Sequence, residues 1–352
     1  MSLFISFPPS LPPSAHPPRS LAFDPSGHVI AAGLAGGAIT LFLLFFSVTP
    51  PSATSFQRAS DSTGELIIME LETRKDCIEE ISDLKFSPNG RMLAVGSHDN
   101  FIDVYSCKLN EMADVSATAA AAAAAAARST QTALVSAPYT LALRYLKRLR
   151  GHTSYVTHLD WSGDNRLLQS TCGSYELLYW DVQSGKQLPQ SRDHLEADCP
   201  WASETCTIGF PVMGIWLPNA KGTDINCVDV RKQQQQQAGT GSHSIVATGD
   251  DFGHLSLFNY PCVVKKAPRK SYQGHSSHIM GIKFIPSATK PSPSSSSPSS
   301  SYSSYSSSSQ APSSKIVTVG GNDCAAIVWK TYPDPVRAFP VKGVKGGRNY
   351  GR

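Results

Sequence analysis

Five stretches of the chain share one pattern of apolar and polar positions. The stretch LAVGSHDNFIDVYS, which begins at Leu93, holds an apolar run that reaches a glycine, a polar turn, and a second apolar run with an aromatic residue. Four further stretches match it without a gap, and they begin at Ile30, Leu168, Val246 and Val317. Two short apolar runs joined by a turn of Gly, Asp, Asn or Ser are typical of a β-hairpin. The sequence therefore predicts five copies of one hairpin.

Two positions of this hairpin are shared by the copies. The fourth position is glycine in all copies but one, and its residues are Gly33, Gly96, Thr171, Gly249 and Gly320. The thirteenth position is aromatic in every copy, and its residues are Phe42, Tyr105, Trp180, Phe258 and Trp329. A unit repeated in this way indicates a repeat architecture.

Further strand-like segments flank the hairpins. The segments that precede them are residues 20–28, 83–91, 158–166, 225–230 and 279–286. The segments that follow four of them are residues 64–71, 144–149, 186–191 and 269–273. Gly-His introduces two copies, at Gly151-His152 and Gly274-His275, and Trp180-Asp181 closes one hairpin. Four strands per repeat with these marks predict an all-β WD-repeat β-propeller with about five four-stranded blades, a partial propeller.

Segments of low complexity separate strands of the repeat. An alanine run, a glutamine run and a serine-rich tract fall there, where long loops are tolerated because the entropy of loop closure grows slowly with length. We place the blades in residues 15–332, between a proline-rich segment (1–14) and a basic tail (333–352). The expected insertions are residues 43–60, 111–140, 231–242 and 287–314.

The stretch from Val29 to Val48 admits two interpretations. Its twenty residues carry no charge, and that length is enough for a membrane-spanning helix. Its first part also matches the hairpin, with GLAGG as the turn, whereas the LFLLFF that follows has no counterpart in the other copies. We favour a hairpin followed by an insertion, and the membrane segment is the alternative. Residues 201–216 are expected to supply an additional, atypical blade strand.

The net charge and the cysteines indicate which partners and which cellular compartment to expect. The net charge of +4 is too small to indicate nucleic-acid binding. The eight cysteines form no CxxC pair, and several lie inside the strand pattern, so a reduced, intracellular chain is expected. The N-terminal MSLFISFPPSLPP has no basic segment and is interrupted by prolines, unlike a secretory signal.

The histidines of the Gly-His pairs are the first candidates for chemistry. His152 lies six residues before His158, and His275 lies three before His278, so a metal site is one interpretation. We favour the hydrogen-bonded tetrad of a propeller blade, because it satisfies buried polar groups. In the last copy its members are His275, Thr318, Asp323 and Trp329. In the third copy they are His152, Trp180 and, at the aspartate position, Ser174.

The sequence shows no enzymatic constellation. Asp250 and Asp251 stand in GDDFG, which resembles a magnesium-binding kinase motif, but the phosphate loop, strand lysine and catalytic loop that accompany that motif are missing. The cysteines within the strand pattern have no adjacent base, which favours a role as small buried apolar residues. We therefore expect no catalytic activity, no cofactor and no metal.

Basic residues cluster before the two Gly-His pairs. The members of this basic patch are Arg144, Lys147, Arg148, Lys265 and Lys266. Such a patch favours an acidic partner through electrostatic steering. Lys and Arg also protect the exposed edge strand of a sheet from pairing, so the patch has a purely structural interpretation as well.

Several segments resemble one known family. LKFSPNGRMLAVGSHDNFIDVYS, GHTSYVTHLDWS, YELLYWD, CTIGFPVMGIW with GTDIN, GDDFGHLSLFNYPC and GHSSHIMGIKF are similar to successive parts of the echinoderm microtubule-associated protein-like family. The resemblance covers most of residues 20–330 and corresponds to the family's C-terminal propeller. The family's hydrophobic motif region and the propeller that follows it have no counterpart in this sequence, so a fragment or a partial gene model is expected.

The resemblance implies a non-enzymatic protein of the cytoplasm and cytoskeleton that binds tubulin or microtubules through propeller surfaces. Tubulin has an acidic exposed surface, which suits the basic patch. Neither nucleic acid nor a membrane is expected as a partner. The candidate protein-binding turns hold Asp99, Asn100, Asp224, Asp250 and Asp251. The alternative is a generic WD-repeat scaffold that organises other proteins without acting on the cytoskeleton.

Overall fold

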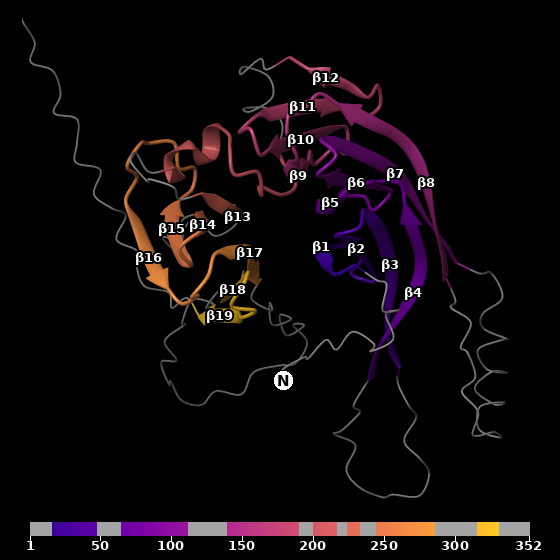
Figure 1. The fold of residues 1–352 in the computed structure, drawn as a ribbon, viewed down its shortest axis with the longest axis horizontal. Helices are drawn as coiled ribbons and strands as arrows, with labels where there is room; N and C mark the ends of the chain where they lie inside the picture. The colour runs from indigo at the N-terminus through magenta and orange to yellow at the C-terminus, as the bar shows by residue number, and fades with distance from the viewer. Residues whose placement is uncertain are drawn as a thin grey trace, which may run out of the picture. The chain divides into compact units, whose positions relative to one another are not determined.

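The structure, a computed structural model, describes residues 16–47, 65–111, 139–189, 200–216, 224–232, 244–285 and 315–330. The chain divides into two units, residues 1–208 and residues 209–352. Both are built from antiparallel sheets whose strands follow one another along the chain (Figure 1). The predicted all-β fold made of propeller blades is confirmed.

Three four-stranded sheets make up the first unit. The first sheet contains β1 (Pro18–Phe23), β2 (Val29–Leu34), β3 (Ala38–Ser47) and β4 (Glu65–Lys75). The second contains β5 (Ile81–Phe86), β6 (Met92–Ser97), β7 (Phe101–Glu111) and β8 (Tyr139–Arg150). The third contains β9 (Val156–Trp161), β10 (Leu167–Cys172), β11 (Leu177–Asp181) and β12 (Lys186–Leu188). Within each sheet, every strand pairs in the antiparallel sense with the next one along the chain.

The sheets of the first unit pack through apolar faces. Successive residues of a strand point to opposite faces of its sheet, so one strand serves two cores. Leu93 of β6 is buried in a cluster with Leu41 of the first sheet, whereas the adjacent Ala94 is buried in a cluster with Trp161 and Trp180 of the third sheet. The first strands β1, β5 and β9 lie next to one another at the inner ends of these sheets (Figure 1).

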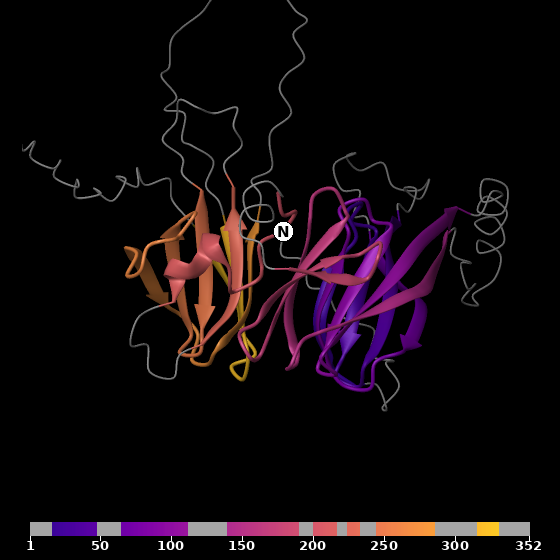
Figure 2. The same ribbon diagram turned by 90° about the horizontal axis from the view of Figure 1, so that it is seen from above.

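The second unit holds two sheets in the part of the chain that the structure describes. One contains β13 (Ile225–Arg231), β14 (Ile245–Asp250), β15 (His254–Asn259) and β16 (Arg269–Gln273). The other has three described strands, β17 (Ile279–Ile285), β18 (Lys315–Gly320) and β19 (Ala326–Lys330). A 3-10 helix, η1 (Phe210–Ile215), lies across the four-stranded sheet in Figure 2 and buries Val212 and Ile215 in a cluster with Val246 and Phe258.

The apolar stretch that begins at Val29 is a β-hairpin. Strand β2 pairs with β3 from Val29, opposite Leu43, to Gly33, opposite Ile39. Strand β3 then continues to Ser47, which pairs with Glu65 of β4. The expected insertion at 43–60 is therefore wrong at its start, because the LFLLFF residues find partners in β4. The membrane interpretation of this stretch is also wrong, since it is a strand pair, and no helix among the described residues is long and apolar enough to span a bilayer.

Two other expected insertions overlap strands at their ends. Glu111, Tyr139, Thr140 and Arg231 were assigned to insertions, but all of them lie in strands. The proline-rich segment 1–14, the insertion 287–314 and the basic tail 333–352 lie outside the described residues.

The fifth hairpin is shifted by one residue relative to the sequence alignment. In the other four hairpins the aromatic residue pairs with the first residue of the template, as Trp180 does with Leu168. Trp329 instead pairs with Ile316, because the turn between β18 and β19 contains one residue more. Val319 therefore stands where the alignment placed Gly320.

Residues 201–216 form no strand, which corrects the expected additional blade strand. Trp201 makes a single bridge with Ser162, and η1 begins at Phe210 with a proline in its first turn. The main-chain N–H groups of Thr205 and Cys206 donate to a side chain instead of a neighbouring strand. A segment whose donors are committed in this way cannot extend a sheet.

We predict that Gly96→Ala destabilises the first unit. A Cβ atom at Gly96 would lie 2.6 Å from Cγ1 of the buried Val156 on β9, so the second and third sheets would have to move apart. Overpacking of this kind costs about 1–3 kcal/mol, to be measured as the loss in unfolding free energy by urea titration. Gly281→Ala is the control, because the nearest atom to its added Cβ is 3.9 Å away. Equal stability of Gly96→Ala and the wild type would contradict the close packing of these sheets.

Candidate functional site

The predicted tetrad residues of the last copy form one hydrogen-bonded chain. Trp329 Nε1 donates to Thr318 Oγ1 over 2.8 Å, and Thr318 Oγ1 lies 2.8 Å from His275 Nε2. His275 Nδ1 lies 2.8 Å from Asp323 Oδ2. The His275 side chain is fully buried, and both of its ring nitrogens have a partner. These hydrogen bonds therefore connect the loop before β17 to β18, to β19 and to the turn between those two strands.

The third sheet has a similar chain with an open end. Trp180 Nε1 donates to Ser170 Oγ over 2.8 Å, and Ser170 Oγ lies 2.7 Å from His152 Nε2. The other ring nitrogen, His152 Nδ1, is buried and has no hydrogen-bond partner, since Glu176 Oε2 is 3.5 Å away. Burial lowers the pKa of His152, although Glu176 raises it in part. Burial therefore favours the neutral form of His152.

Glu176, not Ser174, takes the acid position of this sheet, which corrects the sequence assignment. The ungapped alignment placed Ser174 there, but Ser174 is exposed on the turn. Tyr175, with φ of 59°, adopts a left-handed conformation that ends the turn. Glu176 Oε2 accepts a hydrogen bond from the Thr153 main chain over 2.9 Å, and this bond is the main cause that lowers the pKa of Glu176 to about 2.

Acidic residues at equivalent turns of the other sheets anchor the loop before the first strand. Asp99 accepts hydrogen bonds from the main-chain N–H groups of Ile78 and Glu79, both over 2.9 Å. Asp251 accepts from the Asp224 main chain and the Asn226 side chain, also over 2.9 Å. These are residues that the sequence marked as candidate binding turns. Their carboxylates are engaged within the blade, which gives each turn a fixed shape.

The remaining two candidate residues, Asp250 and Asn100, act within their own turns. Asp250 Oδ1 accepts from the main-chain N–H groups of Phe252 and His254, over 3.0 and 2.9 Å. Asn100 has φ of 68°, a left-handed conformation that asparagine adopts more readily than most residues. Both residues shape their own turn.

Three buried aspartates on first strands form contacts that the sequence analysis missed. Asp83 on β5 accepts a hydrogen bond from the Leu159 main chain on β9 over 2.9 Å. Asp229 on β13 accepts from the Phe284 main chain on β17 over 2.7 Å. Each carboxylate thus crosses from its own sheet to the next one. The sequence signal for each of them was a single aspartate within an apolar strand. Such a residue indicates a hydrogen-bonded carboxylate, because a buried carboxylate is tolerated only with hydrogen-bond partners.

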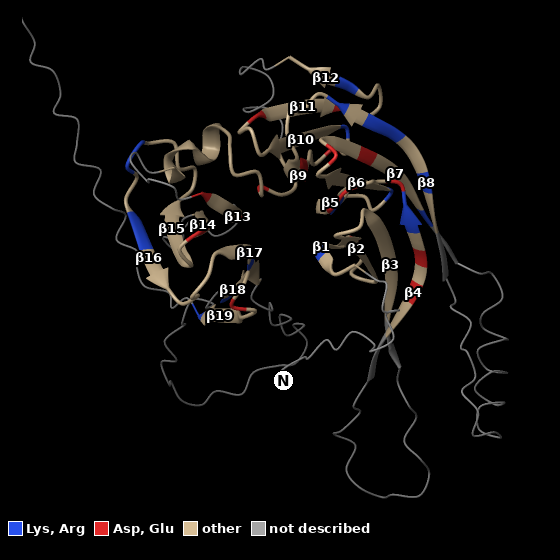
Figure 3. Cartoon of the chain, viewed as in Figure 1, with Lys and Arg blue, Asp and Glu red and all other residues tan. Residues whose placement is uncertain are grey.

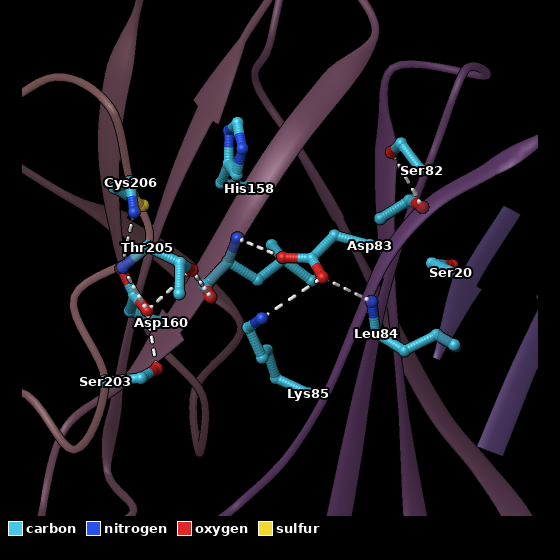
Figure 4. A network of polar contacts seen from close by, with 12 residues as sticks. Ser20, Ser82, Asp83, Leu84, Lys85, His158, Asp160, Ser203, Thr205 and Cys206 are labelled. Atoms are coloured by element: carbon cyan, nitrogen blue, oxygen red, sulfur yellow. Dashed lines mark hydrogen bonds and ion pairs between the residues drawn. The ribbon is translucent and has the colours of Figure 1, made fainter. Parts of the chain in front are cut away.

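Asp160 on β9 is the most extensively bonded of the three (Figure 4). Its side chain is fully buried and accepts from the main-chain N–H groups of Thr205 and Cys206, with a shortest distance of 2.9 Å to each. The hydroxyl groups of Ser203 and Thr205 and the amide of Gln169 donate to it as well. Asp160 thereby holds the segment that follows the third sheet. The equivalent Asp229 holds a strand of the neighbouring sheet instead.

The basic patch splits into two parts with different surroundings. Arg148 on β8 donates twice to the buried Asp103, over 2.7 and 2.8 Å, and this pairing raises the pKa of the guanidinium. Lys147 donates to the Gln183 carbonyl over 2.5 Å. In contrast, Lys265 and Lys266 are exposed just before β16, a strand that is exposed at every residue. Figure 3 shows the basic colouring of both outer strands.

The histidine pairs noted in the sequence do not gather as pairs. His158 Nδ1 lies 3.5 Å from the Thr171 hydroxyl, and His278 Nδ1 lies 3.1 Å from the Ser277 hydroxyl. His152 and His275 belong to the two separate chains described above. Among the buried thiols, burial raises the pKa of Cys77 and Cys227 to about 12, so both are protonated at neutral pH.

Comparison with known proteins identifies what the chain is similar to. The family model described as echinoderm microtubule-associated protein second beta-propeller matches residues 13–331. The 77 kDa echinoderm microtubule-associated protein of Lytechinus variegatus is 34% identical over 274 residues, 77% of this chain and 32% of that protein. Echinoderm microtubule-associated protein-like 3 of Homo sapiens is 31% identical over 315 residues, 88% of this chain and 25% of that protein. The chain thus spans a third or less of the length of these relatives.

We predict that Asp160→Ala strongly destabilises the first unit. The substitution leaves the donors of Thr205 and Cys206 buried without an acceptor, and each such group costs about 1–3 kcal/mol. A loss of about 3 kcal/mol or more is expected in the unfolding free energy from urea titration. The control is Glu79→Ala, because Glu79 is exposed. Similar losses for both variants would show that the buried carboxylate contributes little.

Acid should weaken the third sheet through Glu176. The folded pKa of about 2 lies below the ordinary value of 4.5, so the unfolded chain binds more protons between these values. The contribution of Glu176 to stability is therefore present above pH 4.5 and is lost as the pH falls toward 2. Urea unfolding at several pH values should show the wild type more stable than Glu176→Gln at pH 6. That difference should shrink below pH 4.5, and a difference independent of pH would contradict the assignment.

Proposed function

The chain belongs to the echinoderm microtubule-associated protein family, and on that basis we propose that it is a non-enzymatic WD-repeat protein that binds tubulin or microtubules through the surfaces of its blades. The observation that carries the proposal is the family match, which extends over residues 13–331 and so includes every described strand. The names of the relatives describe microtubule-associated proteins. The cytoplasm and its cytoskeleton are the corresponding location.

The basic outer strand β16 is the surface that we assign to the contact. Tubulin offers an acidic surface, and Lys265 and Lys266 are exposed beside a strand whose residues are all exposed. Arg148 is less suited, because its guanidinium is already bound to a buried carboxylate within the blade. Charges that are free of internal partners contribute most to the rate of encounter with an oppositely charged surface.

A non-enzymatic role is supported by the state of the reactive side chains described above. His275 has partners at both ring nitrogens, and the buried thiols of Cys77 and Cys227 are protonated at neutral pH. A general base needs a pKa near the working pH and access to a substrate. A thiol nucleophile needs to be deprotonated.

Exposed apolar side chains favour a second candidate function, a scaffold for other proteins. Tyr155, Tyr175 and Phe252 are 45%, 58% and 56% exposed on loops and turns. Tyrosine and phenylalanine are enriched in protein interfaces. This candidate requires neither an acidic partner nor salt-dependent binding, which separates it from the first.

We predict that the chain co-sediments with polymerised microtubules and that Lys265→Glu with Lys266→Glu reduces the bound fraction several-fold at about 0.05 M salt. The reduction should diminish at about 0.15 M salt, where the screening length is about 8 Å. Lys108→Glu with Lys186→Glu is the control, because both lysines are exposed on other strands and the change in net charge is the same.

Equal effects of the two double variants would exclude a specific role of β16. If the wild type fails to co-sediment at either salt concentration, the scaffold function is the better account.

A further inference from the structure

Three side chains from separate parts of the third sheet converge at one end of it. His152 precedes β9, Cys172 ends β10, and Glu176 precedes β11. Their donor atoms, a ring nitrogen, a sulfur and a carboxylate oxygen, all lie within 4.8 Å of one another. Glu176 Oε2 is 3.5 Å from His152 Nδ1 and 3.1 Å from Cys172 Sγ.

The fifth sheet, which is the one formed by β17, β18 and β19 in the second unit, shows which contact is missing from the third. There, the equivalent histidine has an aspartate 2.8 Å from its Nδ1 atom, and Gly320 occupies the position of Cys172. In the third sheet the cysteine is present, and the acid stands 3.5 Å from Nδ1 and makes no hydrogen bond with it. His152 Nδ1 is consequently buried without a partner, although its side chain is only 1% exposed. An unsatisfied buried nitrogen needs an explanation.

We propose that His152 Nδ1, Cys172 Sγ and Glu176 Oε2 form a zinc-binding site. Nitrogen, sulfur and carboxylate oxygen are the atoms that bind Zn²⁺ in proteins, at about 2.0–2.3 Å. Two ligands of a tetrahedral ion are then roughly 3.5 Å apart, close to the separations of 3.5 Å and 3.1 Å that join Glu176 Oε2 to His152 Nδ1 and Cys172 Sγ. A thiolate and a carboxylate together neutralise the charge of the ion.

Neighbouring side chains orient two of the three proposed ligands by hydrogen bonds, as is usual around a metal ion. Ser170 Oγ lies 2.7 Å from His152 Nε2, which leaves Nδ1 free to bind the ion as a neutral imidazole. Thr153 donates to both carboxylate oxygens of Glu176, over 2.9 Å from its main chain and 2.8 Å from its hydroxyl. The Glu176 side chain is 31% exposed, so solvent can reach the site and water can supply the fourth ligand.

The ion would join the loop before β9 to the turn between β10 and β11. This is the connection that the complete tetrad makes in the fifth sheet through Asp323. Binding requires the Cys172 thiol to lose its proton to solvent, so the affinity should rise with pH. The site is therefore a stabilising clamp and does not depend on the tubulin-binding proposal.

Cobalt(II) titration of the full chain, after treatment with a chelator, tests the site. The wild type should bind one equivalent that shows thiolate-to-cobalt charge-transfer absorption, and Zn²⁺ should displace it. Cys172→Ala should lose that absorption, and Glu176→Gln should weaken binding at least tenfold. Cys262→Ala is the control, because Cys262 is a buried thiol between β15 and β16 in the second unit.

Thermal unfolding provides a second readout. Zn²⁺ should raise the Tm of the wild type and of Cys262→Ala but leave that of Cys172→Ala unchanged. Circular dichroism establishes that each variant is folded before titration. Charge-transfer absorption that persists in Cys172→Ala, or a wild type that binds neither ion, would overturn the proposal.

Discussion

The hydrogen bond from a main-chain N–H group to a buried aspartate on the first strand of a sheet determines how the sheets of this protein align. Apolar faces supply most of the free energy of packing, but they are non-directional. Asp83 adds a direction, because its carboxylate reaches the N–H group of Leu159 only when the two sheets are in register. Asp229 does the same for Phe284 in the second unit. A carboxylate buried without such donors would be strongly destabilising, so any other alignment is penalised.

A second set of polar contacts fixes four of the five hairpins to the loop before their sheet, each through an acid on the turn. Asp323 completes a chain that runs through His275 to Trp329, whereas Asp99 bonds directly to the main chain. The chemistry of these positions differs among the sheets, yet each acid accepts a hydrogen bond from a main-chain N–H group of the loop. Where the acid stands farther from the histidine, as Glu176 does from His152, the ring nitrogen that faces it makes no hydrogen bond.

Because the first strands and the hairpins supply these contacts, an outer strand can present its side chains to a partner. Asp83, Asp160 and Asp229 lie on first strands, and the hairpins carry the aromatic residues of the repeat. Strand β16 has no buried residue, so its side chains contribute little to the core and their charges can suit a partner. Strand β8 is different, since Arg148 is bound to the buried Asp103, and basic residues that look alike in the sequence therefore have different roles.

The sequence by itself determined the repeated hairpin and the position of most strands, because alternation and turn chemistry are local properties. It predicted β16 at residues 269–273, which are its observed limits. It could not reveal the additional turn residue before Trp329, because Gly320 matches the glycine expected from the alignment. It also could not reveal that Glu176 takes the acid position assigned to Ser174. The partners of the buried aspartates were decided by tertiary structure alone. Asp83 and its donor are 76 residues apart, and hydrogen bonds over such separations leave no periodic signal in the chain.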